Sequence, residues 1–184
     1  MDAGGRGGDQ VSDVGFERGK RGAGLNGHQQ PHHGKSSEHY TPPEFFEAMG
    51  VEFDLDPCSP PGGLPWIPAR KFMDVEQDGL SQPWFGFVWM NPPFGAEVVY
   101  WMRRLARHGH GIALVAARCN TRWWHETVSQ HATSFCQLYK RPYFYNEHRE
   151  RHPYNSGADI VLVAYGARAH DVLVRSGLGK VATL

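Results

Sequence analysis

Four consecutive residues, Asn91-Pro92-Pro93-Phe94, suit the handling of a planar amino group. The side-chain oxygen of Asn91 and the backbone oxygen of Pro92 can accept hydrogen bonds from an amino group on a conjugated ring, such as a nucleobase. Because each proline fixes its own φ, these acceptors need no ordering at the moment of reaction. Phe94 offers a ring face on which a base could stack. Asn-Pro and Pro-Pro are also common in turns that have no chemical role, so that interpretation stays open.

The segments on either side of this turn are expected to hold it at the edge of a sheet. Residues 86–90 form a short apolar run typical of a strand, and residues 96–108 carry apolar side chains at helical spacing. Ligands of open α/β sheets bind beyond the carboxyl ends of the strands. Because the turn follows a strand, its position favours a binding or catalytic role.

Two earlier segments place further polar groups that could serve the same edge. Residues 41–44 have the pattern of a capping box with proline in the first turn, and they predict a helix over residues 42–49. The free N–H groups at a helix start can receive a carboxylate. Residues 51–55 alternate between apolar and polar and predict the first strand. Asp54 and Asp56 lie two residues apart, so one strand face could present a carboxylate to both hydroxyls of a ribose. For one of the two, an exposed loop acid is the alternative.

Four motifs, in this order along the chain, resemble those of the phage-type DNA N6-adenine methyltransferases, which use S-adenosylmethionine. The motifs are Tyr40-Thr41-Pro42-Pro43-Glu44-Phe45-Phe46, Phe53-Asp54-Leu55-Asp56-Pro57-Cys58, Asp78-Gly79-Leu80 with Trp84, and Asn91-Pro92-Pro93-Phe94. The resemblance spans residues 38–165. The cofactor-binding residues that it implies are Tyr40, Thr41, Pro42, Asp54, Asp56 and Asp78. For Asp78, an ordinary Asp-Gly turn is the alternative.

The resemblance implies an enzyme that transfers the methyl group of S-adenosylmethionine to the N6 amino group of adenine in DNA. It assigns the catalytic role to Asn91, Pro92, Pro93 and Phe94. The N4 amino group of cytosine and the amide of a protein glutamine are also planar and conjugated, so the same turn could serve them. Two non-enzymatic alternatives are a DNA-binding module that has lost transfer and a structural or phage-assembly protein.

The charge of the chain limits where DNA could bind. The formal net charge is +0 and the pI is about 7.2, so DNA contact requires a local basic patch. Residues 140–154 are the segment in which basic and aromatic residues interleave. The candidate phosphate contacts are Lys140, Arg141, Arg149 and Arg151, which would give affinity without reading the base sequence. Glu147 and Glu150 favour the alternative of an ordinary surface loop.

The expected fold is a single α/β domain with a Rossmann-like methyltransferase sheet, mostly parallel. Its strands are expected near residues 51–55, 86–90, 111–116, 134–139 and 158–164. The expected division of the chain is a disordered Gly-rich tail over residues 1–36, a methyltransferase domain over residues 37–168 and a C-terminal extension over residues 169–184. The stretch between Asp56 and Asn91 is too short for a separate recognition domain.

Cysteine spacing and hydropathy indicate the cellular compartment. Cys58, Cys119 and Cys136 are widely spaced and show no zinc-binding pattern, which suits a reducing environment and predicts no metal. The chain has no run of about 18 apolar residues that would predict a membrane span. The first residues lack the apolar core of a signal peptide. The protein is therefore expected in the cytoplasm, or in the host cytoplasm if a phage encodes it.

Overall fold

The computed structural model describes residues 39–184 of the 184-residue chain. The tail expected over residues 1–36 lies outside the described residues. The elements, in chain order, are α1 (Pro43–Met49), β1 (Phe53–Asp56), β2 (Ala69–Phe72), β3 (Val88–Met90), α2 (Val98–His108), β4 (Gly111–Ala116), α3 (Arg122–Trp124), the π-helical turn η1 (His125–Ser129), β5 (Ser134–Leu138), β6 (Ile160–Tyr165), α4 (Ala167–Ser176) and β7 (Gly179–Thr183). The five expected strands are all present, with ends within two residues of those expected.

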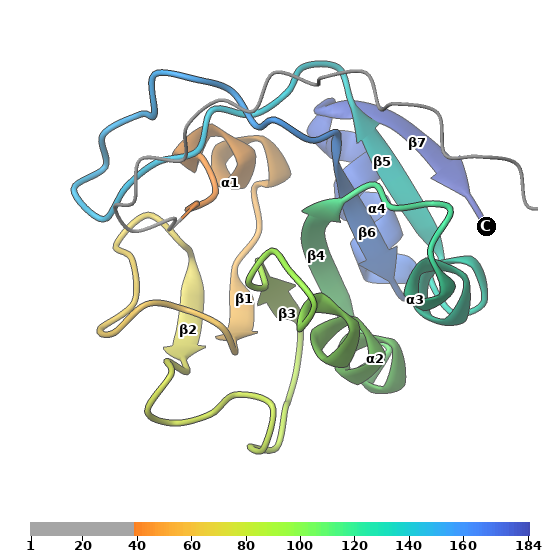
Figure 1. The fold of residues 1–184 in the computed structure, drawn as a ribbon, viewed down its shortest axis with the longest axis horizontal. Helices are drawn as coiled ribbons and strands as arrows, with labels where there is room; N and C mark the ends of the chain where they lie inside the picture. The colour runs from red at the N-terminus through yellow and green to blue at the C-terminus, as the bar shows by residue number, and fades with distance from the viewer. Residues whose placement is uncertain (1–38) are drawn as a thin grey trace, which may run out of the picture. The chain divides into compact units, whose positions relative to one another are not determined.

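The seven strands form one mixed sheet in the order β2-β1-β3-β4-β6-β5-β7 (Figure 1). Strands β2, β1, β3 and β4 are parallel, whereas β6 is antiparallel to both β4 and β5, and β7 is antiparallel to β5. The expectation of a mostly parallel sheet is therefore correct at one end of the sheet only. Parallel neighbours need a long crossover, usually a helix. Residues 139–159, between β5 and β6, contain no helix, so β6 returns antiparallel to β5.

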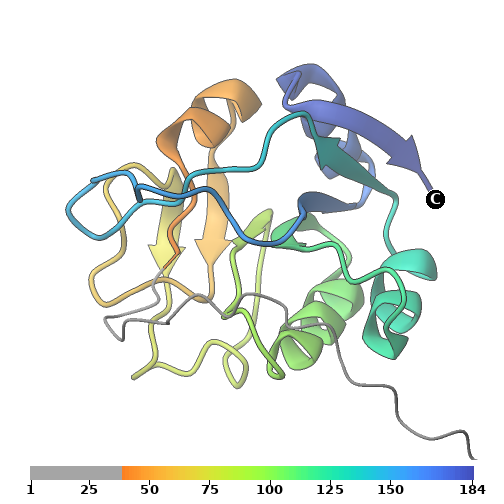
Figure 2. The same ribbon diagram turned by 45° about the horizontal axis from the view of Figure 1, so that its top comes forward.

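Helices cover both faces of the sheet (Figure 2). On one face, the apolar side chains of α1 and α4 pack with Phe53, Trp89 and Ile112. On the other face, α2, α3 and η1 pack with Met90 and Ala113. Successive residues of β3 and β4 thus point to opposite cores, as the pleat of a strand requires. This arrangement explains why the central strands are apolar on both sides.

Helix α1 begins later than the capping-box pattern predicts. Pro42 is its N-cap, with φ −58° and ψ 138°, and no side chain caps the helix. The residue before a proline is driven out of the helical region, so Pro43 prevents Pro42 from joining the helix. Thr41 therefore lies one residue outside the cap position. Its buried hydroxyl has no hydrogen-bond partner among the described residues, so the predicted capping role of Thr41 is wrong.

The residues expected to form a C-terminal extension pack into the same domain. Ala169, Val172 and Leu173 of α4 are fully buried, and β7 pairs with β5 along its whole length. The last two elements thus complete one core and one edge of the sheet. Within residues 39–184, no helix is both long enough and apolar enough to cross a membrane.

Candidate active site

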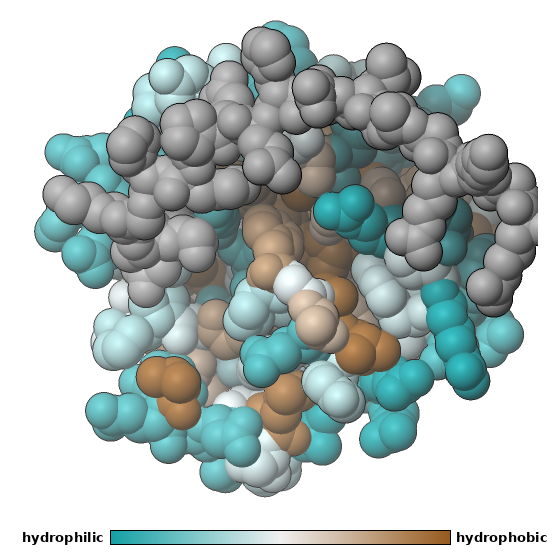
Figure 3. Space-filling view, in the orientation of Figure 1, coloured by the Kyte–Doolittle hydropathy of each residue, from teal (hydrophilic) through white to brown (hydrophobic). Residues whose placement is uncertain are grey.

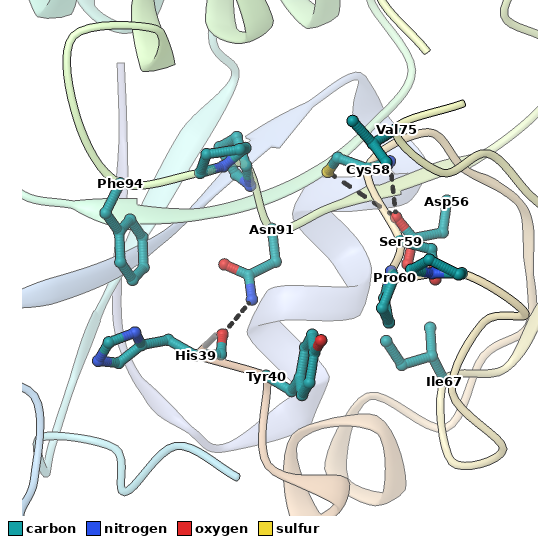
Figure 4. Close-up of a pocket in the computed structure, with 13 residues that line it drawn as sticks. His39, Tyr40, Asp56, Cys58, Ser59, Pro60, Ile67, Val75, Asn91 and Phe94 are labelled. Carbon is teal, nitrogen blue, oxygen red and sulfur yellow. Dashed lines mark hydrogen bonds between the residues drawn. The ribbon is translucent and has the colours of Figure 1, made fainter. Parts of the chain in front are cut away.

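A cavity of about 350 Å³ lies at the carboxyl ends of β1 and β3 (Figure 4). These two strands are adjacent and parallel, so the segments that follow them open at the same edge of the sheet. All four residues of the turn at 91–94 line the cavity, and so do two of the predicted cofactor-binding residues, Tyr40 and Asp56. The structure therefore brings together residues that lie up to 54 positions apart, from Tyr40 to Phe94.

The side chain of Asn91 is held in one orientation. Its amide nitrogen Nδ2 donates a hydrogen bond of 2.8 Å to the backbone oxygen of His39. A backbone oxygen can only accept, so this contact assigns the nitrogen and the oxygen of the amide. The Asn91 oxygen Oδ1 then points toward the Phe94 side of the cavity (Figure 4), and no described residue donates a hydrogen bond to it. The amide thus presents an acceptor to the cavity.

The two prolines hold the backbone that follows Asn91. Pro92 is buried and Pro93 is exposed. No described residue donates a hydrogen bond to the backbone oxygen of Pro92. The turn therefore offers two acceptor oxygens, the Asn91 side-chain oxygen held by the hydrogen bond to His39 and the Pro92 backbone oxygen held by the proline rings.

Phe94 stands in a group of four rings at the mouth of the cavity. Its ring centroid lies 6.0 Å from that of His39 and 5.7 Å from that of Phe144. His39 in turn stacks on His152, with centroids 5.5 Å apart and ring planes 2° apart. Phe94 is still 42% exposed, which leaves part of its ring open to a ligand. Figure 3 shows apolar side chains near the centre of one face of the molecule, with hydrophilic ones along its right-hand edge.

Asp56 is a buried carboxyl group in the cavity wall. It is only 2% exposed, and burial raises its pKa from 3.8 to about 7 even though hydrogen bonds from Cys58 oppose the rise. The backbone N–H of Cys58 donates to Asp56 Oδ1 over 3.2 Å. No described cation forms an ion pair with Asp56. A buried acid with a perturbed pKa in a cavity is a common mark of a binding site.

Asp54 lies outside the cavity and has a structural role. Its Oδ2 accepts a 2.7 Å hydrogen bond from the backbone N–H of Phe87, and its Oδ1 lies 3.4 Å from the Arg70 guanidinium. The regular alternation of β1 is broken at this point, because Phe53 packs on the α1 and α4 face whereas Leu55 packs on the α2 face. The two acids therefore do not share a strand face, contrary to the expectation from their spacing.

The other predicted cofactor-binding residues take different positions. Thr41 and Pro42 are buried but do not line the cavity, and the Thr41 backbone oxygen accepts a 3.0 Å hydrogen bond from Trp66 Nε1. Asp78 is exposed, has φ +49° and lies in a turn outside the cavity, where its backbone oxygen accepts the N–H of Ser81. The alternative of an ordinary turn at Asp78 thus fits its geometry.

The four predicted DNA contacts have different local surroundings. Lys140 and Arg141 border a second cavity, of about 420 Å³, beside β5 and β6, and Arg141 forms a 2.8 Å ion pair with Asp159. Arg149 borders a separate hollow beside α1. The guanidinium of Arg151 lies 4.5 Å from the centre of the Tyr143 ring. All four cations are exposed.

Seven cavity residues were not predicted as site residues, and three of them, His39, Cys58 and Ser59, carry polar groups. His39 provides the backbone oxygen that orients Asn91. Cys58 lies between the two strand ends. Its thiol stays neutral because burial, and to a smaller extent the charge of Asp56, raises the pKa of the thiol. Ser59 is only 7% exposed, and its hydroxyl has no hydrogen-bond partner among the described residues. Only the closeness of Cys58 and Ser59 to Asp56 in the sequence could have indicated them.

The polar groups of the cavity suit an organic ligand with hydroxyl and amino groups. They comprise the Asp56 carboxyl, the unpartnered Ser59 hydroxyl and the Asn91 oxygen, set among proline and apolar side chains. Cavities with a few convergent polar groups in apolar walls are typical of small-molecule sites. No cluster of three or more metal-binding side chains is present within residues 39–184.

Compared with models of protein families, with curated proteins and with solved structures, the chain matches none of them. The chemistry of the site is therefore interpreted from its own geometry and from the four motifs.

Proposed function

We propose that the protein transfers the methyl group of S-adenosylmethionine to the N6 amino group of adenine in DNA. The observation that carries this proposal is the shared cavity, which holds the Asn91 acceptor oxygen, the open Phe94 ring and the buried Asp56 carboxyl. A Rossmann-like methyltransferase architecture belongs to the same proposal. It is supported by the parallel half of the sheet, by helices on both of its faces and by a cavity at the carboxyl ends.

The turn at residues 91–94 handles the acceptor in this proposal. The lone pair of an exocyclic amino group is delocalised into the base, so the group is a poor nucleophile. Hydrogen bonds from its two hydrogens to Asn91 Oδ1 and to the Pro92 backbone oxygen orient it and favour a tetrahedral nitrogen. Because His39 already holds the Asn91 amide, little reorganisation remains for the reaction itself.

Phe94 receives the adenine base after the base leaves the DNA duplex. Extruding a base from a duplex costs a few kcal/mol, and stacking on an aromatic ring returns about 1–3 kcal/mol. The 42% exposure of Phe94 fits this role, since a ring closed off by its neighbours could not stack. Phe144 and His39 support the ring from the side.

Asp56 holds the cofactor in this proposal. In its ionised form it accepts hydrogen bonds from ribose hydroxyls, and Tyr40 lines the same cavity. When bound, S-adenosylmethionine supplies a methyl group that its sulfonium makes electrophilic. Asp54 and Asp78 lie outside the cavity, so Asp56 is the acid to which we assign the ribose.

The test uses the purified 184-residue chain, S-adenosylmethionine with a labelled methyl group, and DNA. Nucleoside analysis of the treated DNA should find N6-methyladenine. Asn91→Ala should lower the rate of transfer about 10²- to 10³-fold, as expected for loss of one preorganised hydrogen-bonding group, and should leave cofactor binding almost unchanged. Gln130→Ala removes an exposed amide outside the cavity and serves as the control.

Each other result has a definite meaning. Full activity of Asn91→Ala would refute the catalytic assignment. N4-methylcytosine in the DNA, or methylation of protein glutamine with DNA unchanged, would replace the acceptor but keep the enzyme class. DNA binding without binding of S-adenosylmethionine would indicate a binding module instead of an enzyme. Absence of both binding activities would point to a structural protein.

A further inference from the structure

The hydroxyl of Ser59 is a buried polar group that the protein itself does not satisfy. Ser59 is 7% exposed, and its Oγ forms no hydrogen bond with any described residue. Buried hydroxyls in folded proteins nearly always have a partner, because the protein otherwise loses the hydrogen bonds that water provided. Ser59 lines the same cavity as Asp56 and Asn91, so a ligand in that cavity can supply the missing partner.

The sequence around Ser59 removes one common local partner. A serine hydroxyl can bond to the backbone N–H two residues further along the chain. The next two residues are Pro60 and Pro61, which have no N–H group. The hydroxyl therefore has no donor immediately after it in the chain.

Backbone hydrogen bonds hold Ser59 and thereby fix where its side chain begins. The N–H of Ser59 donates to the Met73 backbone oxygen over 3.0 Å, and the N–H of Met73 donates to the Asp56 backbone oxygen over 2.9 Å. A Cβ added at Gly79 would lie 1.9 Å from the Pro57 backbone oxygen, so the segments around these two residues are in close contact. The loop after β1 is thus held by backbone hydrogen bonds to Met73 and packs closely against Gly79.

We infer that Ser59 binds the ribose of S-adenosylmethionine together with Asp56, an inference that rests on the proposed function. An ionised carboxyl can only accept hydrogen bonds, whereas a hydroxyl can both donate and accept. Two neighbouring ribose hydroxyls offer donors to Asp56 and either role to Ser59. The carboxylate of the methionine half is a poorer candidate, because the nearby Asp56 carboxyl would repel it.

The test compares wild type with Ser59→Ala by calorimetric titration and by thermal unfolding. Loss of one hydrogen bond should weaken binding of S-adenosylmethionine and of adenosine about tenfold. The ligand-free variant should unfold at the same temperature as wild type or at a higher one, since the change removes an unsatisfied polar group. Ser129→Ala, which removes an exposed hydroxyl outside the cavity, should change neither quantity.

Adenosine analogues identify the atoms involved. If Ser59 contacts a ribose hydroxyl, Ser59→Ala should lose about tenfold in affinity for adenosine, but nothing for whichever of 2′-deoxyadenosine and 3′-deoxyadenosine lacks that hydroxyl. An equal loss for adenosine and both analogues would overturn the assignment to the ribose.

Two further outcomes separate this inference from the proposed function. If wild type binds S-adenosylmethionine and Ser59→Ala binds it equally well, the inference fails and the proposed function stands. If wild type binds neither S-adenosylmethionine nor adenosine, both fail. A lower unfolding temperature of ligand-free Ser59→Ala would show a structural role and would also overturn the inference.

Discussion

The buried carboxyl of Asp56 gives the protein a pH dependence of stability that can be worked out in advance. Burial raises its pKa from 3.8 to about 7 in the folded protein. Between pH 4 and pH 7, the unfolded chain has lost the Asp56 proton and the folded protein has kept it. Because the folded state then binds more protons, stability falls as the pH rises through this range. The free energy of unfolding falls by about 4 kcal/mol in total, because the pKa differs by about 3 units between the two states and each unit corresponds to about 1.36 kcal/mol.

Asp56→Asn keeps the size of the side chain and removes the titration. The free energy of unfolding of wild type should fall relative to that of Asp56→Asn by about 4 kcal/mol between pH 4 and pH 8, which is a change of about 10 °C in relative Tm. The amide cannot reproduce every contact of the carboxyl, but that cost is the same at each pH. The change with pH is therefore the quantity to compare.

The measurement is urea denaturation of both proteins, without ligand, at several pH values from 4 to 8. Asp171→Asn changes an exposed acid on α4 and serves as the control. Other titrating groups contribute equally to both proteins and cancel in the difference. If the two stability curves run parallel across the whole range, Asp56 is not the buried acid that we describe, and the reasoning is refuted.

Two more substitutions test the acceptor side of the cavity and the frame that carries it. Phe94→Ala should weaken binding of DNA with an unpaired target adenine by about 1–3 kcal/mol, measured by fluorescence anisotropy, and leave S-adenosylmethionine binding unchanged; equal DNA affinity would exclude stacking on this ring. Gly86→Ala should destabilise the fold by about 3 kcal/mol in urea denaturation, because Gly86 has φ +61° and the new Cβ would lie 2.3 Å from Asp54 Oδ2. Gly157→Ala, where a Cβ meets nothing within 4 Å, is the matched control; equal stability of both variants would show that the loop at Gly86 relaxes freely.

The sequence was sufficient for the positions of the main elements and for the centre of the site. Continuous or alternating apolar residues reveal strands and a period of 3.6 reveals helices, because each pattern follows the sides of the element that are buried, and all five expected strands are present. The grouping of Asn91 with Asp56 also followed from local information. Both residues come at the ends of strands, and adjacent parallel strands deliver their ends to one edge.

Local patterns failed where a position depends on a distant segment. The spacing of Asp54 and Asp56 predicted one shared face, but Asp54 bonds to Phe87, 33 residues further along the chain, and Asp56 is buried in the cavity. The capping pattern at Thr41 fails because Pro43 keeps Pro42 out of the helix, so that Thr41 lies one residue before the cap position.

The amino-acid sequence by itself determined five of the seven strands and which turn carries the acceptor groups, but it did not identify β2 and β7 as strands. Only the tertiary structure decided that half of the sheet is antiparallel, that one acid of the pair enters the cavity, and that Ser59 is left without a partner. The physical reason is that burial and hydrogen-bond partners are set by contacts between segments far apart in the chain. A pattern of neighbouring residues records which side chains must be buried, but it does not record what buries them.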